Sequence, residues 1–212
     1  MRLFLASYRF GGHEQRFVDL IGTPGPIAVI ANAVDSWSAP ARASALSSDV
    51  APLQTLGFEP IEVDLRDYID RPDAVRETLA RFPAVWVRGG NTFVLRAQLA
   101  RSGADRALTD LVRSDSLVYT GYSAGACAMT PSLRGIEAAD DPNEVRPTCG
   151  IDPVWDGLGL YDRAIVPHWQ SETDVDDANP GIVARFQADG TPHQVLTDDQ
   201  VIVVDGDVTE LL

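Results

Sequence analysis

The chain has 212 residues, of which 45% are hydrophobic and 23% are charged, and its formal net charge is -14. This length fits a single α/β domain, residues 1–212, with a sizeable core. The negative charge argues against nucleic acid or an anionic membrane as a partner, because both need a positive protein surface. Apart from three histidines, all 17 basic side chains are arginines, which excludes Schiff-base chemistry on a lysine.

The sequence also bears on location and cysteine chemistry. The first apolar run, residues 3–6, is too short for a secretory signal peptide, and no stretch is long enough to span a bilayer. We therefore expect a cytoplasmic protein. Cys127 and Cys149 are too few for a disulfide framework, and the sequence leaves open whether they pair. It does not distinguish a monomer from a homodimer.

Hydrophobic periodicity and turn residues predict strands that alternate with helices along the first 120 residues. The predicted strands are residues 3–6, 26–33, 58–65, 84–87 and 117–120. The predicted helices are residues 14–21, 39–56, 73–81, 93–101 and 105–114, of which 93–101 is amphipathic. This alternation indicates a mostly parallel sheet with helices on both faces.

The second part of the chain has a different character. Residues 131–154 are rich in Pro, Gly and acidic side chains and read as a long surface loop near the site. Further strands are predicted at 163–166, 193–196, 201–205 and 208–211, with a helix at 180–188. Asp205-Gly206 is typical of a hairpin turn, so we expect the sheet to end in antiparallel strands.

The clearest chemical pattern is Gly121-Tyr-Ser-Ala-Gly125, which lies between an apolar strand and a run of small residues suited to a helix start. Gly-x-Ser-x-Gly in this position is the nucleophile elbow, where a strained turn exposes the serine hydroxyl. We therefore predict Ser123 as a nucleophile and the backbone N–H of Ala124 as a donor to an oxyanion. The alternative is a chance pattern in which Ser123 is only a turn residue.

A second pattern, Gly89-Gly90-Asn91, follows the predicted strand 84–87. The carboxyl ends of parallel strands lie at one edge of a sheet, so this loop can face the elbow. The N–H of Gly90 would then complete an oxyanion hole with that of Ala124. A capped turn or a phosphate-binding loop is the alternative.

A serine nucleophile needs a general base, and the chain offers His13, His168 and His193. His168 follows a predicted strand, which places it at the same edge as the elbow, whereas His193 begins a strand and points to the opposite edge. We therefore predict His168 as the base. The three histidines are scattered without metal-ligand spacing, so we expect no metal and no other cofactor.

A carboxylate normally orients such a histidine, but the spacing does not single one out. The usual α/β-hydrolase order places the acid between the serine and the histidine, which favours Glu137, Asp140 or Asp141. Asp198 and Asp199 precede the strand 201–205 and are also available. A further acidic run follows His168: Glu172, Asp174, Asp176 and Asp177.

Four stretches together resemble the dipeptidase E (aspartyl dipeptidase) family of serine peptidases, which is related to cyanophycinase. They are Arg88-Gly-Gly-Asn-Thr-Phe93, Gly121-Tyr-Ser-Ala-Gly-Ala126, Ser132-Leu-Arg-Gly135 and Pro167-His-Trp169. The resemblance covers most of the chain. It implies a fold similar to class I glutamine amidotransferases, with Ser123 as nucleophile, His168 as base and Gly90 in the oxyanion hole.

The resemblance also ranks the remaining site residues. Asp198 lies in the region where the family carries a Glu, so we rank it first as the acid and Asp141 second. Binding an aspartyl side chain needs a cation, and Arg185 falls where the family places binding arginines. We predict Asn91, Arg185 and Glu172 as substrate-binding residues.

The function that follows is a serine peptidase that hydrolyses dipeptides or short peptides at a free N-terminus, with Asp-X as one specificity. Its partner would be a small peptide substrate. Two alternatives use the same sequence features. One is an esterase or acyltransferase built on the same elbow, and the other is a catalytically silent binding module with an amidotransferase-like fold.

Overall fold

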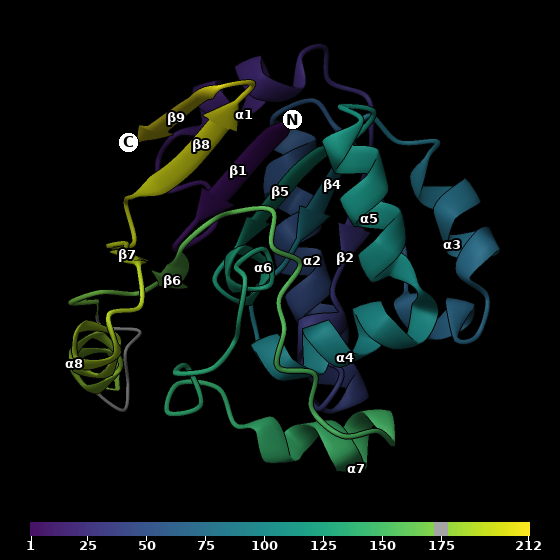
Figure 1. Ribbon diagram of the computed structural model, residues 1–212. Helices are drawn as coiled ribbons and strands as arrows, with labels where there is room; N and C mark the ends of the chain where they lie inside the picture. The colour runs from purple at the N-terminus through teal and green to yellow at the C-terminus, as the bar shows by residue number, and fades with distance from the viewer. Residues whose placement is uncertain (172–177) are drawn as a thin grey trace.

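The computed structural model describes residues 1–171 and 178–212. Its centre is a seven-stranded sheet in the order β3-β2-β4-β5-β1-β8-β9 (Figure 1). These strands are β1 (Arg2–Ala6), β2 (Pro26–Ile30), β3 (Glu59–Glu62), β4 (Ala84–Val87), β5 (Val118–Tyr122), β8 (Val201–Asp205) and β9 (Val208–Leu211). The first five run parallel, and β8 and β9 are antiparallel. The mostly parallel sheet with antiparallel C-terminal strands is therefore confirmed.

Helices cover both faces of this sheet, and successive strand residues point into two different cores. In β1, Leu3 and Leu5 pack into one core while Phe4 and Ala6 pack into the other. Strands that are buried on both faces consist of continuous apolar runs, and such runs can be recognised in the sequence. The second core lies under α1 (Glu14–Ile21) and α2 (Ala39–Thr55). The first lies under α3 (Pro72–Leu79), α4 (Thr92–Ser102) and α5 (Ala104–Arg113) (Figure 1).

The predicted amphipathic character of α4 is wrong. Nine of its eleven residues are buried, because other elements surround it. Its neighbours are α5, η1 (Asn32–Val34), η2 (Leu65–Tyr68), α6 (Ala124–Cys127) and α7 (Val145–Cys149). The predicted strands 26–33 and 58–65 are also too long, because the turns η1 and η2 begin where β2 and β3 have ended.

Two short strands lie outside the main sheet. β6 (Ala164–Val166) and β7 (His193–Val195) pair in parallel with each other, beside α8 (Asn179–Asp189) (Figure 1). The predicted loop 131–154 contains α7 and a short turn, η3 (Pro142–Glu144). Within residues 1–171 and 178–212, no helix combines the length and apolar character needed to cross a membrane.

Candidate active site

The site lies at the edge of the sheet where parallel strands end. Ser7 follows β1, the Gly89–Gly90 pair follows β4, and Ser123 follows β5. His168 comes just after β6, so the small second sheet delivers it to the same place. Ligand sites of α/β proteins form at such carboxyl ends, because the loops there converge on one crevice.

Ser123 occupies a strained turn between β5 and α6. Its φ of 51° and ψ of -116° are rare for a residue with a side chain. The backbone holds the turn, because Ser123 N–H donates to the Ala6 carbonyl (3.0 Å) and the Ser123 carbonyl accepts from Cys127 N–H (2.9 Å). A Cβ at Gly125 would overlap the carbonyl oxygen of Val87. The elbow therefore needs a glycine at this position.

The Ser123 hydroxyl, the His168 ring and the Asp198 carboxylate form one hydrogen-bonded row. Ser123 Oγ lies 3.0 Å from His168 Nε2, and His168 Nδ1 lies 2.6 Å from Asp198 Oδ1. His168 has a φ of 59°, and the Asn179 side chain donates to its carbonyl (3.2 Å), which helps to fix the turn. In this arrangement His168 can accept the serine proton while Asp198 fixes the ring orientation.

Two serines hold the Asp198 carboxylate. Ser7 Oγ donates to Asp198 Oδ1 (3.1 Å) and accepts from His168 N–H (2.7 Å), and Ser171 Oγ donates to Asp198 Oδ2. Burial alone would raise the pKa of Asp198, but hydrogen bonds from Ser171, His168 and Ser7 outweigh it and lower that pKa. Sequence reasoning missed both serines, although Ser7 directly follows the first strand.

The other predicted carboxylates make different contacts. Asp140 accepts from Thr92 N–H (2.9 Å), Asp141 caps η3 through Asn143 N–H (2.9 Å), and Glu137 accepts from Gly135 N–H (2.5 Å). Among the described residues, Asp198 is the carboxylate that hydrogen-bonds the His168 ring. Glu172 lies outside the described residues.

Gly90 is the second predicted donor to an oxyanion. Its φ is 146°, and a Cβ there would lie 2.6 Å from the carbonyl oxygen of Ala33. That carbonyl also accepts from Asn91 N–H (2.8 Å), so the η1 turn supports the loop from behind. In the part of the chain that the structure describes, the N–H groups of Gly90 and Ala124 have no protein acceptor.

The Asn91 side chain is engaged within the protein. Its Oδ1 accepts from the N–H groups of Phe93 (2.9 Å) and Val94 (3.1 Å), which makes it the N-cap of α4. Its Nδ2 donates to the Asp141 carbonyl (2.9 Å). Asn91 thus joins the loop after β4 to the segment that contains Asp140 and Asp141.

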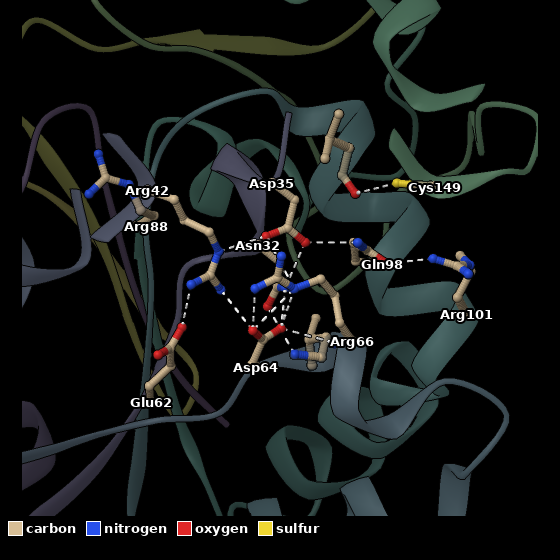
Figure 2. Close-up of polar contacts among 12 residues, drawn as sticks. Asn32, Asp35, Arg42, Glu62, Asp64, Arg66, Arg88, Gln98, Arg101 and Cys149 are labelled. Atoms are coloured by element: carbon tan, nitrogen blue, oxygen red, sulfur yellow. Dashed lines mark hydrogen bonds and ion pairs between the residues drawn. The ribbon is translucent and has the colours of Figure 1, made fainter. Parts of the chain in front are cut away.

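A partly buried polar cluster surrounds Asn32 of the η1 turn (Figure 2), the turn whose Ala33 carbonyl lies against Gly90. We call it the Arg42 network; it consists of Asn32, Asp35, Arg42, Glu62, Asp64, Arg66 and Gln98. Arg42 lies 2.9 Å from Asp35 and 3.2 Å from Asp64, and Asn32 donates to both carboxylates. Burial would raise the pKa of Asp64, but hydrogen bonds from Arg66 and Asn32 lower it to about 2.

A cavity of about 610 Å³ contains both Ser123 and His168. One part of its lining is apolar: Cys127, Ile136, Ala139, Val166, Ala178 and Ile182. The lining also includes Arg9, Arg88, Asp140 and His168. A larger groove of about 840 Å³ reaches Asp198 from the other side of Tyr8 and Arg9, but neither Ser123 nor His168 lines it. We therefore take the smaller cavity as the substrate site.

Several predicted or candidate residues lie elsewhere. Arg185 is half exposed, pairs with Glu137 (3.4 Å) and does not line the cavity. His13 and His193 contact backbone carbonyls, those of Asp199 (3.1 Å) and Thr191 (2.9 Å) respectively.

Neither cysteine is in a disulfide. Cys127 and Cys149 are free and buried. Burial raises the pKa of both thiols, that of Cys149 to about 11, so both are unreactive near neutral pH. The described residues contain no group of three or more metal-ligating side chains that could hold an ion.

Comparison with known proteins identifies the family. Residues 42–212 match the sequence profile of peptidase family S51. The chain belongs to this family. As an S51 member it is a serine-type peptidase, which agrees with a cavity-lining serine hydroxyl 3.0 Å from a histidine ring.

Individual relatives of this S51 peptidase agree with the assignment. The uncharacterized peptidase Lin0382 of Listeria innocua serovar 6a is 28% identical over 156 residues, covering 74% of this chain and 71% of that protein. Peptidase E of Streptomyces coelicolor is 41% identical over 86 residues, covering 41% of this chain and 32% of that protein.

Two solved structures share the fold. A provisionally named peptidase E from Listeria monocytogenes EGD-e has a TM-score of 0.82 and 22% identity, covering 100% of this chain and 97% of that one. A peptidase from an acI-B1 Actinobacterium has a TM-score of 0.74 and 13% identity, covering 100% and 86%. At these identities the likeness concerns the fold alone.

Proposed function

We propose that this peptidase releases the N-terminal residue of dipeptides or short peptides, with Ser123 as nucleophile, His168 as general base and Asp198 as the orienting acid. One observation carries the proposal: the unbroken hydrogen-bonded row from Ser123 Oγ through His168 to Asp198, with steps of 3.0 Å and 2.6 Å. These separations lie within the reach required for a serine nucleophile and its base.

The reaction is an acyl transfer in two halves. Ser123 Oγ attacks the carbonyl carbon of the first residue while its proton moves to His168 Nε2, and the amides of Gly90 and Ala124 receive the oxyanion. The C–N bond then breaks, and His168 gives the proton to the leaving amine. Water, deprotonated by His168, cleaves the resulting ester and regenerates Ser123.

The cavity favours an apolar first residue over aspartate. Arg88 could attract an aspartyl side chain, but it is already paired with the buried Asp49 at 2.6 Å. The apolar lining around Ile136, Val166 and Ile182 instead suits an aliphatic side chain.

Arg9 supports a small peptide as the substrate. It lines the cavity, and among the described residues it has no ion pair with a carboxylate. A dipeptide carries its C-terminal carboxylate one residue beyond the scissile bond, and a positive side chain in the cavity can hold that group. Larger substrates place this charge farther from Ser123.

A dipeptide panel tests the proposal. Leu-Leu should be hydrolysed at a higher kcat/KM than Asp-Leu, and p-nitrophenyl esters should not replace peptides as the preferred substrates. Ser123→Ala should abolish hydrolysis and labelling by a fluorophosphonate, while the thermal unfolding midpoint stays unchanged. Faster cleavage of Asp-Leu would overturn the apolar preference. Wild-type turnover by Ser123→Ala would overturn the site assignment.

A further inference from the structure

Asp140 is a carboxylate of the substrate cavity that the proposed acyl transfer does not use. It belongs to the segment after the elbow and lines the cavity together with Ser123 and His168. Thr92 holds it at the N-terminus of α4, through its N–H (2.9 Å) and its hydroxyl (2.5 Å). These bonds give Asp140 a fixed place in the cavity wall, where the helix N-terminus offsets part of the cost of burying its negative charge.

Within the described residues, only one oxygen of the Asp140 carboxylate accepts hydrogen bonds. Both hydrogen bonds from Thr92 go to Oδ2, and Oδ1 has no hydrogen-bond partner among residues 1–171 and 178–212. The same residues supply no arginine, and no histidine, within ion-pair distance of Asp140. Burial raises the pKa of Asp140, as expected of a carboxylate held away from water without a cation beside it.

The basic side chains of the cavity lining have other contacts within the described residues, and Arg9 donates to the Ser48 carbonyl (2.6 Å). Arg88 pairs with Asp49 (2.6 Å), and His168 contacts Asp198 and Ser123. Asp140 is therefore the one lining carboxylate among the described residues, and it is available for a positive group of a bound molecule.

In a substrate with a free N-terminus, the positive ammonium group of the first residue lies close to the carbonyl carbon that reacts. The ammonium nitrogen is joined to the scissile carbonyl through a single Cα, so the two atoms lie about 2.5 Å apart. A group that binds the ammonium must therefore lie beside the oxyanion donors. Thr92, which holds Asp140, is two residues beyond Gly90 in the same loop.

We propose that the Asp140 carboxylate binds the α-ammonium group of the substrate's first residue and so restricts cleavage to peptides with a free N-terminus. This assignment rests on the proposed function. An internal or acylated residue would place a neutral amide against the same carboxylate and would leave the charge unpaired. Such a residue is poorly accepted, because a site built for a polar partner rejects the analogue that lacks it.

The test compares leucine p-nitroanilide with its N-acetyl derivative. Wild type should prefer the free amine in kcat/KM by about 100-fold or more, and Asp140→Asn should remove most of that preference by slowing the free-amine substrate. Asp140→Glu should keep part of the preference, since it keeps the charge. Asp141→Asn is the matched control, because Asp141 caps η3 and should leave the ratio unchanged.

Fluorophosphonate labelling separates binding of the ammonium from a general structural role. The probe is uncharged and needs Ser123, its base and the oxyanion donors, so Asp140→Asn should be labelled at close to the wild-type rate. An unchanged substrate ratio in Asp140→Asn, or labelling slowed in parallel with hydrolysis, would overturn the assignment alone. A wild-type enzyme that is labelled but hydrolyses neither these substrates nor any dipeptide of the panel would overturn the proposed function and the assignment together.

Discussion

At the scale of single residues, the contact between Asp198 and His168 decides which nitrogen of the ring carries its proton. Asp198 Oδ1 lies 2.6 Å from Nδ1, which leaves Nε2 to accept from Ser123. Asp198→Asn keeps the shape but removes the charge and the preference for this tautomer. We expect kcat to fall by about 10³ to 10⁴-fold, measured on the best dipeptide of the panel.

Asp141→Asn is the comparison that makes this result informative. Asp141 was the second candidate for the acid, and its side chain accepts from Asn143 at the start of η3. We expect this variant to keep kcat within a few-fold of wild type. If Asp141→Asn lost activity while Asp198→Asn kept it, the roles assigned to the two carboxylates would be reversed.

Ser7 is a positioning residue that contacts both His168 and Asp198. Its hydroxyl donates to Asp198 and accepts from the backbone N–H of His168. Ser7→Ala leaves that partly buried N–H without its acceptor, so we expect a loss of about 1 kcal/mol in the free energy of unfolding. We also expect kcat to fall about tenfold, because the ring and the carboxylate lose a common anchor.

Denaturant unfolding and dipeptide kinetics check the Ser7 prediction together. Ser47→Ala provides the control, because its hydroxyl bonds only the Ala43 carbonyl of its own helix (3.0 Å) and is exposed. Wild-type kinetics in Ser7→Ala would show that the ring and Asp198 align without this serine.

The role of a residue within a sequence motif could be predicted from that motif, whereas a contact between residues far apart in the sequence could not. Ser123 and Ala124 follow from Gly-x-Ser-x-Gly, since the motif specifies its own turn. Asp198 and Ser7 are 191 positions apart yet share a hydrogen bond. No local pattern predicts such a contact: spacing left several carboxylates open, and only the family resemblance ranked Asp198 first as the acid.

At the scale of elements, the Arg42 network decides how firmly the η1 turn supports the loop that contains Gly90. The Asp35 side chain is only 1% exposed and accepts from Arg42, Asn32 and Gln98. Asp35→Asn breaks a buried ion pair and leaves Arg42 partly unpaired. We expect it to lower the free energy of unfolding by about 1–3 kcal/mol, because Arg42 keeps Glu62 (2.8 Å) and Asp64 (3.2 Å) as partners.

The matched variant for Asp35 is Asp110→Asn. Asp110 pairs with Arg76 at 2.8 Å, but both side chains are at least half exposed, and such pairs contribute about 0–1 kcal/mol. Urea unfolding of both variants provides the measurement. Equal losses in the two proteins would contradict a stabilising role for the buried network.

The bounds of a helix or strand were predicted correctly where residues close to both of its ends mark them in the sequence. The helix 14–21 and the strand 84–87 were predicted with their observed bounds, because a clear pattern and adjacent turn residues mark both ends. The run 26–33 is apolar throughout, yet the chain turns after Ile30 to form η1. Hydrophobicity reports burial there, and burial alone does not distinguish a strand from a buried turn.

At the scale of the whole molecule, acid stability depends on carboxylates whose pKa differs between the folded and unfolded states. The pKa of Asp64 falls from 3.8 to about 2 on folding. A lowered pKa stabilises the folded state above the unfolded value, and this stabilisation is lost as the pH falls from about 4 to about 2. The contribution is at most about 2 kcal/mol.

Asp64→Asn removes that pH-dependent contribution. Between pH 5 and pH 2 we expect the variant to lose about 2 kcal/mol less stability than wild type, although it is less stable at neutral pH. Urea unfolding at several pH values provides the measurement, with Asp162→Asn as the control because its side chain is 85% exposed. Parallel pH profiles for Asp64→Asn and wild type would contradict the shift.

The strand order has a consequence for the chain during synthesis. β1 lies between β5 and β8, so Ser7 meets its carboxylate partner only after Asp198 has left the ribosome. A nascent chain that ends before residue 168 carries the elbow without the histidine, and one that ends before 198 lacks the acid. The proposed catalytic row is therefore complete only when the C-terminal strands have joined the sheet, and we expect unfinished chains to be without peptidase activity.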